Sequence, residues 1–266
     1  MKVVAGPWVG EFGWELFCWQ AYIRAMSKVF NFTDVVCVTR PGRELLYEDF
    51  ARVKVLKDIP NHGSDMHSCR GYSFKKFIDS YSKEYPDYEL ILPFNCWYHG
   101  KSVSINGQQV TAEFNALGQH TKNSEYPVIL HARSREHRSS DNWSRKNWNV
   151  LVSKLSREGI PFAFIGSKEE SLFIDGGADL RGMPLCDVVG YLAGAKCVVG
   201  PSSGPMHLAT LCKCPQVVWS GNDSNEIRYK QEWNPFETPV AYLGNEYGGW
   251  NPNPETVYRK IIELLC

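Results

Sequence analysis

The feature that most constrains this chain is a regular alternation of short apolar segments with longer segments of helical periodicity. The apolar run at residues 34–40 is followed by such a segment, and the same succession recurs after residues 127–133 and 196–200. Parallel strands need crossover connections, usually helices, and these helices cover both faces of the sheet. The alternation therefore predicts an α/β protein built on doubly wound parallel sheets.

The alternation runs through both halves of the chain, so we expect two sheets. We predict strands at residues 2–5, 34–40, 53–56, 88–94, 127–133, 161–167, 196–200 and 214–221, helices at 14–30, 42–50, 73–85, 147–159, 184–195, 204–212 and 254–265, and a hairpin within 102–114. This order predicts two Rossmann-like lobes facing a central cleft, a short N-terminal lobe at 1–124 and a C-terminal lobe at 125–266. The terminal helix is compatible with packing back on the first lobe.

Composition narrows the function classes. Lys and Arg together number 29, as do Asp and Glu, so the net charge is zero and gives no sign of nucleic-acid binding. The nine cysteines include no CxxC pair, which favours reduced thiols over disulfides or a zinc site. No apolar run approaches the ~20 residues of a membrane span, and the first ten residues do not resemble a signal peptide. We expect a soluble, cytoplasmic protein without a metal site.

The segment "GPSSGPMHLAT", residues 200–210, leaves an apolar strand through two serines and enters a helix at once. Proline is favoured in the first helical turn, so the amides that open the helix would point at one spot beside the serine hydroxyls. Unpaired amides and the helix dipole favour an anion there. A serine cap and a packed histidine explain the same residues equally well. The candidate binding residues are Ser202, Ser203, Gly204, Pro205, Met206 and His207.

Basic side chains gather in residues 131–148, between a predicted strand and the next helix. At the carboxyl end of a strand these side chains are placed to neutralise a bound diphosphate. A diphosphate that is bound without a metal ion needs such positive charges from the protein. A solvated charged surface is the alternative interpretation. The candidates are Arg133, Arg135, Arg138 and Lys146.

The loop after the first predicted strand, residues 6–13, contains three glycines that permit a tight turn close to a ligand. Gly10 and Gly13 flank Glu11, a carboxylate placed before a helix where a general base could reach an acceptor proton. A capping role for Glu11 is the alternative. Glu15, inside the helix, is expected to be an ordinary helix-start charge. Trp8 and Trp14 are candidates for stacking on a ligand.

A fourth predicted strand ends near Gly166 and is followed by the residues "SKEES". These residues are compatible with contact to a nucleoside or with the cap of a following helix. The sequence contains no DxD carboxylate pair, HExxH, GxSxG or Walker loop. Metal-dependent glycosyl transfer, P-loop hydrolysis and nucleophile-elbow chemistry therefore lose support.

Three segments resemble glycosyltransferase family 9, the heptosyltransferase-like enzymes. "GMPLCDVVGYLAGAKCVVGPSSGPMHLATLCKCPQVVWSG" is similar to the family's helix, strand and D-S/T-G-P-x-H-x-A loop, and "RKNWNVLVSKLSREGIPFAFIGS" to its K-x-W segment. "GEFGWELFCWQAYIRAMSKVFNFTDVVCVTRPG" is similar to the family's G-D loop, long helix and second strand. The resemblance covers residues 128–221 well and 8–42 weakly.

The resemblance implies a GT-B arrangement and metal-independent transfer of a sugar from a nucleotide-diphosphate sugar. Lys146 matches the family's phosphate-binding lysine, and Ser203, Gly204 and His207 match its diphosphate loop. Glu11 stands where the family's base, an Asp, usually is. Ser202 replaces the Asp of the diphosphate loop, so this chain departs from the family at two positions.

We therefore expect a glycosyltransferase without cofactor that acts on a hydroxyl acceptor, such as a glycan. Its catalytic residues would be Glu11, Lys146 and His207. Two alternatives stay open: an inactive nucleotide-sugar or phosphate-binding module, and a glycosyltransferase that acts on modified nucleic-acid bases.

Overall fold

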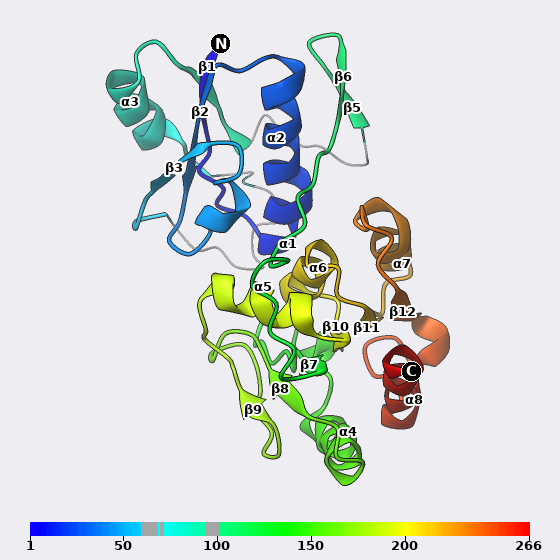
Figure 1. Cartoon of the computed structure of the whole chain (residues 1–266). Coiled ribbons are helices and arrows are strands. Elements are labelled where there is room, and N and C mark those ends of the chain that lie inside the picture. The colour runs from blue at the N-terminus through cyan, green and yellow to red at the C-terminus, as the bar shows by residue number, and fades with distance from the viewer. Residues whose placement is uncertain (60–68, 70–71, 94–101) are drawn as a thin grey trace. The chain divides into compact units, whose positions relative to one another are not determined.

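The computed structural model describes residues 1–59, 69, 72–93 and 102–266. The chain divides into two compact units, Met1–Phe114 and Asn115–Cys266 (Figure 1). Each unit contains one parallel sheet, so the doubly wound α/β fold predicted from the alternation is confirmed.

The N-terminal unit is built on a four-stranded sheet of order β3-β2-β1-β4, with every neighbouring pair parallel. Its helices α2 and α3 lie on opposite sides of this sheet in Figure 1, as right-handed crossovers in opposite directions require. A two-stranded antiparallel hairpin, β5-β6, confirms the predicted one. The elements are β1 (Lys2–Ala5), α1 (Phe12–Trp14), the π-helix η1 (Glu15–Trp19), α2 (Gln20–Val29), β2 (Asp34–Thr39), the 3₁₀ turn η2 (Glu44–Leu46), β3 (Arg52–Val55), α3 (Lys75–Glu84), β4 (Glu89–Ile91), β5 (Ser102–Ile105) and β6 (Gln108–Thr111).

The C-terminal unit is built on a six-stranded parallel sheet of order β12-β11-β10-β7-β8-β9. Helix α8 packs against α4, and α5 packs against α6. The elements are β7 (Val128–Leu130), the 3₁₀ turn η5 (Ser139–Asp141), α4 (Arg145–Arg157), β8 (Phe162–Phe164), β9 (Ala178–Asp179), α5 (Leu185–Gly194), β10 (Cys197–Pro201), α6 (Gly204–Leu211), β11 (Gln216–Trp219), α7 (Ser224–Ile227), the π-helix η6 (Arg228–Glu232), β12 (Val240–Leu243), the 3₁₀ turn η7 (Asn245–Tyr247) and α8 (Pro254–Leu265).

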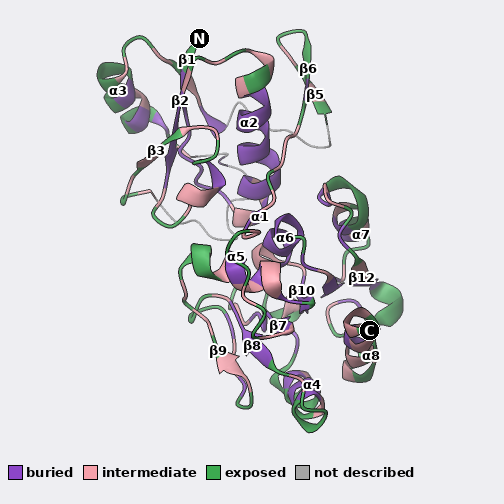
Figure 2. Cartoon of the chain, in the orientation of Figure 1, coloured by how far each residue is buried: buried purple, intermediate pink, exposed green. Residues whose placement is uncertain are grey.

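The central strands of the C-terminal sheet are buried along their whole length (Figure 2). Helices cover both faces, so the strands read as continuous apolar runs without alternation. Trp143, Trp148 and Trp219 pack together in the core, and Val257 and Ile261 attach helix α8 to it. Helix α4 ends as predicted, with Gly159 in the left-handed conformation at φ +66°.

Tertiary contacts override local pattern at two places. The predicted helix at 42–50 is only the 3₁₀ turn η2, because Leu46 O accepts from Arg24 of α2 and the Tyr47 hydroxyl donates to Glu15 of η1. Strands β9 and β12 lie in segments where we predicted no element.

The division between the units falls at Phe114, ten residues before the expected boundary at 124. Residues after it pair with C-terminal helices: Leu117 N–H donates to Leu211 O at 2.9 Å and Asn123 N–H to Gly190 O at 3.0 Å. Helix α8 packs within the C-terminal unit, on α4 and on strands β10 and β11.

One buried arginine joins separate segments of the N-terminal unit. Arg24 on α2 has a side chain only 3% exposed and forms two 2.9 Å hydrogen bonds with the Asp49 carboxylate. It also donates to the carbonyls of Leu46 and Glu113, at 3.1 Å each. Its guanidinium therefore satisfies two backbone acceptors besides the ion pair.

Replacing Arg24 by Met should lower the free energy of unfolding by about 3 kcal/mol, because the carbonyls and Asp49 lose their donor. Urea denaturation measures the change. The control is Arg52→Met, whose ion pair with Asp34 involves an arginine side chain 60% exposed, so its loss should change the free energy of unfolding far less. Equal losses in the two variants would contradict the structural role of Arg24.

Candidate functional site

The strand order of the C-terminal sheet places two loops side by side. From β7 the chain moves to one side through β8 and β9, then returns to form β10 on the other side of β7. Leu130 of β7 is paired with Val199 of β10, so residues 131–133 and 200–203 leave the sheet at the same edge. In doubly wound sheets ligands bind at this switch point, beyond the carboxyl ends of the strands. The predicted basic segment and the predicted anion loop therefore meet where such a site is expected.

The turn between β10 and α6 provides fewer unpaired amides than the sequence led us to expect. Pro205 has no N–H, and the His207 N–H donates to Ser203 O at 3.1 Å. The Ser202 N–H donates to Trp219 O at 2.8 Å, and the Ser203 N–H to the Tyr229 hydroxyl at 3.3 Å. The first turn of a helix has no internal acceptors for its amides, and Met206 is fully buried, so the Gly204 amide is the one in this turn placed to face a ligand.

The serines of this turn make different contacts. The Ser203 hydroxyl donates to Pro201 O at 2.9 Å and does not cap the helix. The Ser202 hydroxyl accepts from Tyr229 at 3.2 Å and from Asn225 Nδ2 at 3.5 Å. Both serines are partly exposed, whereas Met206 is buried.

His207 lies inside the protein, only 8% exposed. Its ring stacks on Tyr229 with centroids 4.5 Å apart and meets Trp233 edge-on at 4.7 Å. Burial, with a smaller contribution from the Arg228 charge, lowers the pKa of His207 to about 3. The imidazole is therefore neutral at physiological pH and cannot supply a positive charge to a phosphate.

Arg133 is the basic residue closest to the turn. Its side chain is buried, and its guanidinium donates to Ser202 O at 2.7 Å and to Asp141 O. Its Nε is buried without a hydrogen-bond partner among the described residues, and its Cζ lies 5.0 Å from the Trp250 ring centroid. Burial and the neighbouring Arg135 lower the pKa of Arg133 to about 10, so it remains a cation at neutral pH.

The other basic candidates are more exposed. Arg135 pairs with Asp141 at 3.0 Å, while Arg138 is exposed and in the left-handed conformation at φ +53°. Lys146 is exposed in the first turn of α4, whose N-cap Ser144 accepts from Asn147 N–H at 3.2 Å. Arg133 and Arg135 thus both contact Asp141, and Lys146 lies in α4, the helix that follows this loop.

Gly166 borders the same loops. It has φ +128°, and a Cβ there would come within 2.8 Å of Ser171 Oγ and 3.1 Å of His131 Nδ1. His131 is itself buried, with Nδ1 3.3 Å from Ile165 O, and burial lowers its pKa to about 4. His131 begins the basic segment at residues 131–148, and the sequence alone indicated no role for it.

In the N-terminal unit, Glu11 is the N-cap residue of α1 and makes no side-chain capping bond. Its carbonyl accepts from Trp8 Nε1 at 3.0 Å and from Glu15 N–H at 3.2 Å. The loop starts from β1, the strand next to the switch point of its own sheet, between β1 and β4. Gly10, Gly13 and Trp8 are buried, and Trp14 is partly exposed, so Trp14 is the better placed of the two to meet a ligand.

Glu15 is not the ordinary surface charge that the sequence suggested. Its side chain is 3% exposed, forms an ion pair with Arg43 at 3.1 Å and accepts from the Tyr47 hydroxyl at 2.8 Å. Glu15 also begins the π-helix η1, a type of helix often found near functional sites. Helical periodicity did not reveal this, because the partners of Glu15 lie about thirty residues away.

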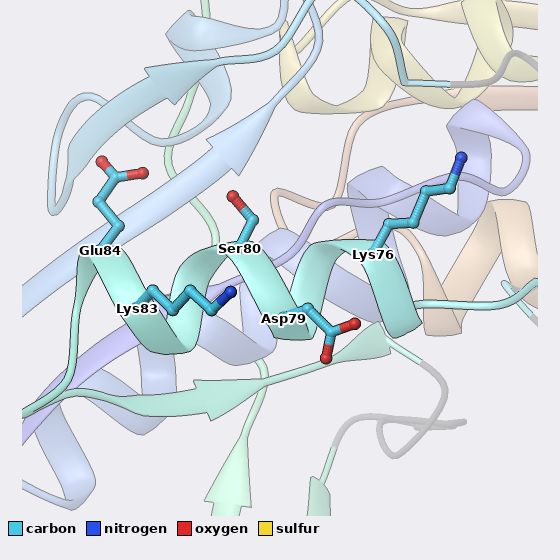
Figure 3. Close-up of a pocket in the computed structure, with 5 residues that line it drawn as sticks. All are labelled: Lys76, Asp79, Ser80, Lys83 and Glu84. Carbon is cyan, nitrogen blue, oxygen red and sulfur yellow. The ribbon is translucent and has the colours of Figure 1, made fainter.

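A pocket on α3 does not involve the candidate residues. It is lined by Lys76, Asp79, Ser80, Lys83 and Glu84, all from this one helix (Figure 3). Among the residues that the structure describes, no group of three His, Cys, Asp or Glu side chains is arranged to hold a metal ion. None of the described helices is long and apolar enough to cross a membrane.

Comparison with known families confirms the resemblance seen in the sequence. Residues 97–228 match the model of glycosyltransferase family 9 (heptosyltransferase). The match starts upstream of residue 128, where we placed the strong resemblance, and does not include residues 8–42. Among curated proteins, none matches this chain in sequence.

Solved structures share the whole fold at low sequence identity. ADP-heptose LPS heptosyltransferase II of E. coli superposes with a TM-score of 0.60 at 15% identity, covering 100% of this chain and 98% of that chain. E. coli heptosyltransferase WaaC with ADP gives 0.61 at 14% identity, covering 99% and 100%. The iron-containing glycosyltransferase TibC of enterotoxigenic E. coli gives 0.51 at 15% identity, covering 91% and 66%.

These likenesses show the GT-B fold with its two Rossmann-like lobes. Because TibC is described as iron-containing, our expectation that this chain uses no cofactor stays a prediction. Fold and family model agree: the chain has the fold of the heptosyltransferases, and its residues 97–228 match glycosyltransferase family 9.

Proposed function

We propose that this glycosyltransferase moves a sugar from a nucleotide-diphosphate sugar to a hydroxyl of a glycan acceptor, without a metal ion. The observation that carries the proposal is the meeting of Arg133 with the β10–α6 turn at the sheet's switch point, with guanidinium and Ser202 carbonyl 2.7 Å apart. A buried cation and the amide of the partly exposed Gly204 favour an anion in the same place.

The diphosphate would be stabilised by groups of the C-terminal unit. The Gly204 amide, Arg133 Nε and the exposed ammonium of Lys146 are donors suited to the charge that builds on the leaving diphosphate. These groups are cations and amides instead of carboxylates. This supports the proposal that the protein itself, and not a metal ion, neutralises the charge of the diphosphate. Arg135, Arg138 and Gly166 border the site and would complete it.

His207 takes a different role from the one its sequence position suggested. Because its imidazole is neutral and stacked on Tyr229, it would shape the turn and hydrogen-bond within it. The acceptor hydroxyl would be deprotonated by Glu11, a partly exposed carboxylate in the loop that follows β1.

Replacing Lys146 by Ala should raise the KM for the donor or lower kcat by ~10- to 1,000-fold, because one charge-stabilising group is lost. Steady-state rates with ADP-, GDP- and UDP-sugars measure the effect. Lys154→Ala, two turns further along α4, is the matched control, since Lys154 pairs with Glu255 instead of facing the turn. Unchanged kinetics of the Lys146 variant would remove this residue from the site.

Replacing Glu11 by Gln should lower kcat by ~10²- to 10⁴-fold, because the amide cannot accept the acceptor proton. The KM for the donor should change little, since the donor groups belong to the other unit. Initial rates at saturating donor measure kcat, with Glu48→Gln, an exposed carboxylate, as the control. A Glu11→Gln variant as fast as the wild type would show that another group is the base.

The buried histidines should make stability depend on pH. The folded-state pKa is lowered from 6.5 to about 3 for His207 and about 4 for His131, chiefly by burial. Their stabilising contribution is full above pH ~6.5 and is lost as the pH falls, because only the unfolded chain then binds protons. Between pH 8 and 5 each should cost about 2 kcal/mol.

Urea denaturation at both pH values tests this, with His207→Gln as the comparison. The variant should lose about 2 kcal/mol less than the wild type between pH 8 and 5. Identical losses would mean that His207 is protonated in the folded protein.

The alternatives make different predictions for the wild type. Donor binding without turnover on any acceptor, water included, would favour an inactive nucleotide-sugar-binding module. DNA affinity that falls steeply with added salt would favour a nucleic-acid acceptor.

A further inference from the structure

We propose that Tyr229 is a positioning residue that sets the geometry of the β10–α6 turn for the donor diphosphate; this rests on the proposed function. Tyr229 belongs to the π-helix η6 and lies just beyond the residues that match the family model. Its side chain is buried, and sequence reasoning gave it no role.

The Tyr229 hydroxyl contacts three consecutive parts of the site. It accepts from the Ser203 N–H at 3.3 Å, donates to Ser202 Oγ at 3.2 Å and lies 3.4 Å from His207 Nε2. One phenol thus connects the end of β10 with the first turn of α6. Without it the Ser203 amide would lose its acceptor.

The hydrogen bonds of the Ser202 and Tyr229 hydroxyls indicate how the phenol orients the turn for an anion. Ser202 Oγ accepts from both Tyr229 and Asn225 Nδ2, which uses the two lone pairs of the hydroxyl. Its own hydrogen then remains to be donated to an anion seated on the Gly204 amide. In this arrangement the Tyr229 oxygen accepts from Ser203 N–H and from His207 Nε2–H, so His207 carries its proton on Nε2.

Packing holds the phenol in place independently of its hydroxyl. The ring is stacked on His207 with an interplanar angle of 15° and lies 6.3 Å from the Tyr242 ring. Burial raises the pKa of Tyr229, which keeps the phenol protonated as the donor role requires. Removing only the hydroxyl should therefore leave the ring packing intact.

The test is Tyr229→Phe in the full chain, with Tyr242→Phe as the matched control. Tyr242 is also a buried phenol of this unit, but its hydroxyl donates to Asn222 O at 2.8 Å. Calorimetry with ADP, GDP and UDP gives the Kd, steady-state kinetics give KM and kcat, and hydrogen exchange of the ligand-free protein reports on the Ser203 amide.

In Tyr229→Phe we expect the Kd of the diphosphate that binds the wild type, and the donor KM, to rise about tenfold, the size of one lost hydrogen bond at ~1.4 kcal/mol. The kcat at saturating donor should stay within about threefold, which a merely destabilised enzyme would not show. Exchange of the Ser203 amide should become faster. Tyr242→Phe should match the wild type in all three.

Unchanged Kd, KM and Ser203 exchange in Tyr229→Phe would overturn the proposal while leaving the proposed function intact. A fall in kcat and unfolding midpoint with unchanged KM would also overturn it, because the phenol would then be structural only. Failure of the wild type to bind any of the three diphosphates would instead contradict the proposed function, and the exchange of Ser203 would still decide whether the phenol holds the turn.

Discussion

The pairing of β7 with β10 is the constraint on which the candidate donor site depends. These strands are far apart in the sequence, and their register brings the ends of both to one edge of the sheet. Arg133 then crosses from one loop to the other and donates to Ser202 O and Asp141 O. A buried guanidinium whose Nε has no hydrogen-bond partner is costly without an anion, which supports our proposal that the donor diphosphate binds beside Arg133.

The candidate site combines cations with neutral hydrogen-bonding groups. Arg133 and Lys146 would supply charge, whereas His207 is neutral and the Tyr229 hydroxyl forms hydrogen bonds with both serines of the turn. This division suits the replacement of the family's Asp by Ser202. A carboxylate there would compete with the ligand for Arg133, while a hydroxyl fixed by Tyr229 can donate to it.

Much of the fold could be predicted from sequence, because buried parallel strands are continuous apolar runs and their helices begin and end at recognisable residues such as Gly159. The strand order could not be predicted, because no local sequence feature indicates that β10 pairs with β7. The sequence located the loops at Ser202–His207 and Arg133–Lys146, but not the burial of His207. Glu15 and Tyr229 were missed because their partners are distant in the chain.

The most direct test of the account is an NMR titration of the ¹⁵N-labelled chain with the nucleoside diphosphate that binds it. The account predicts that the largest shifts fall on the Gly204 amide and on the Arg133 Nε–H, which have an acceptor to gain there. Saturable binding that leaves both signals unmoved, while shifting others, would place the diphosphate elsewhere and contradict the central claim.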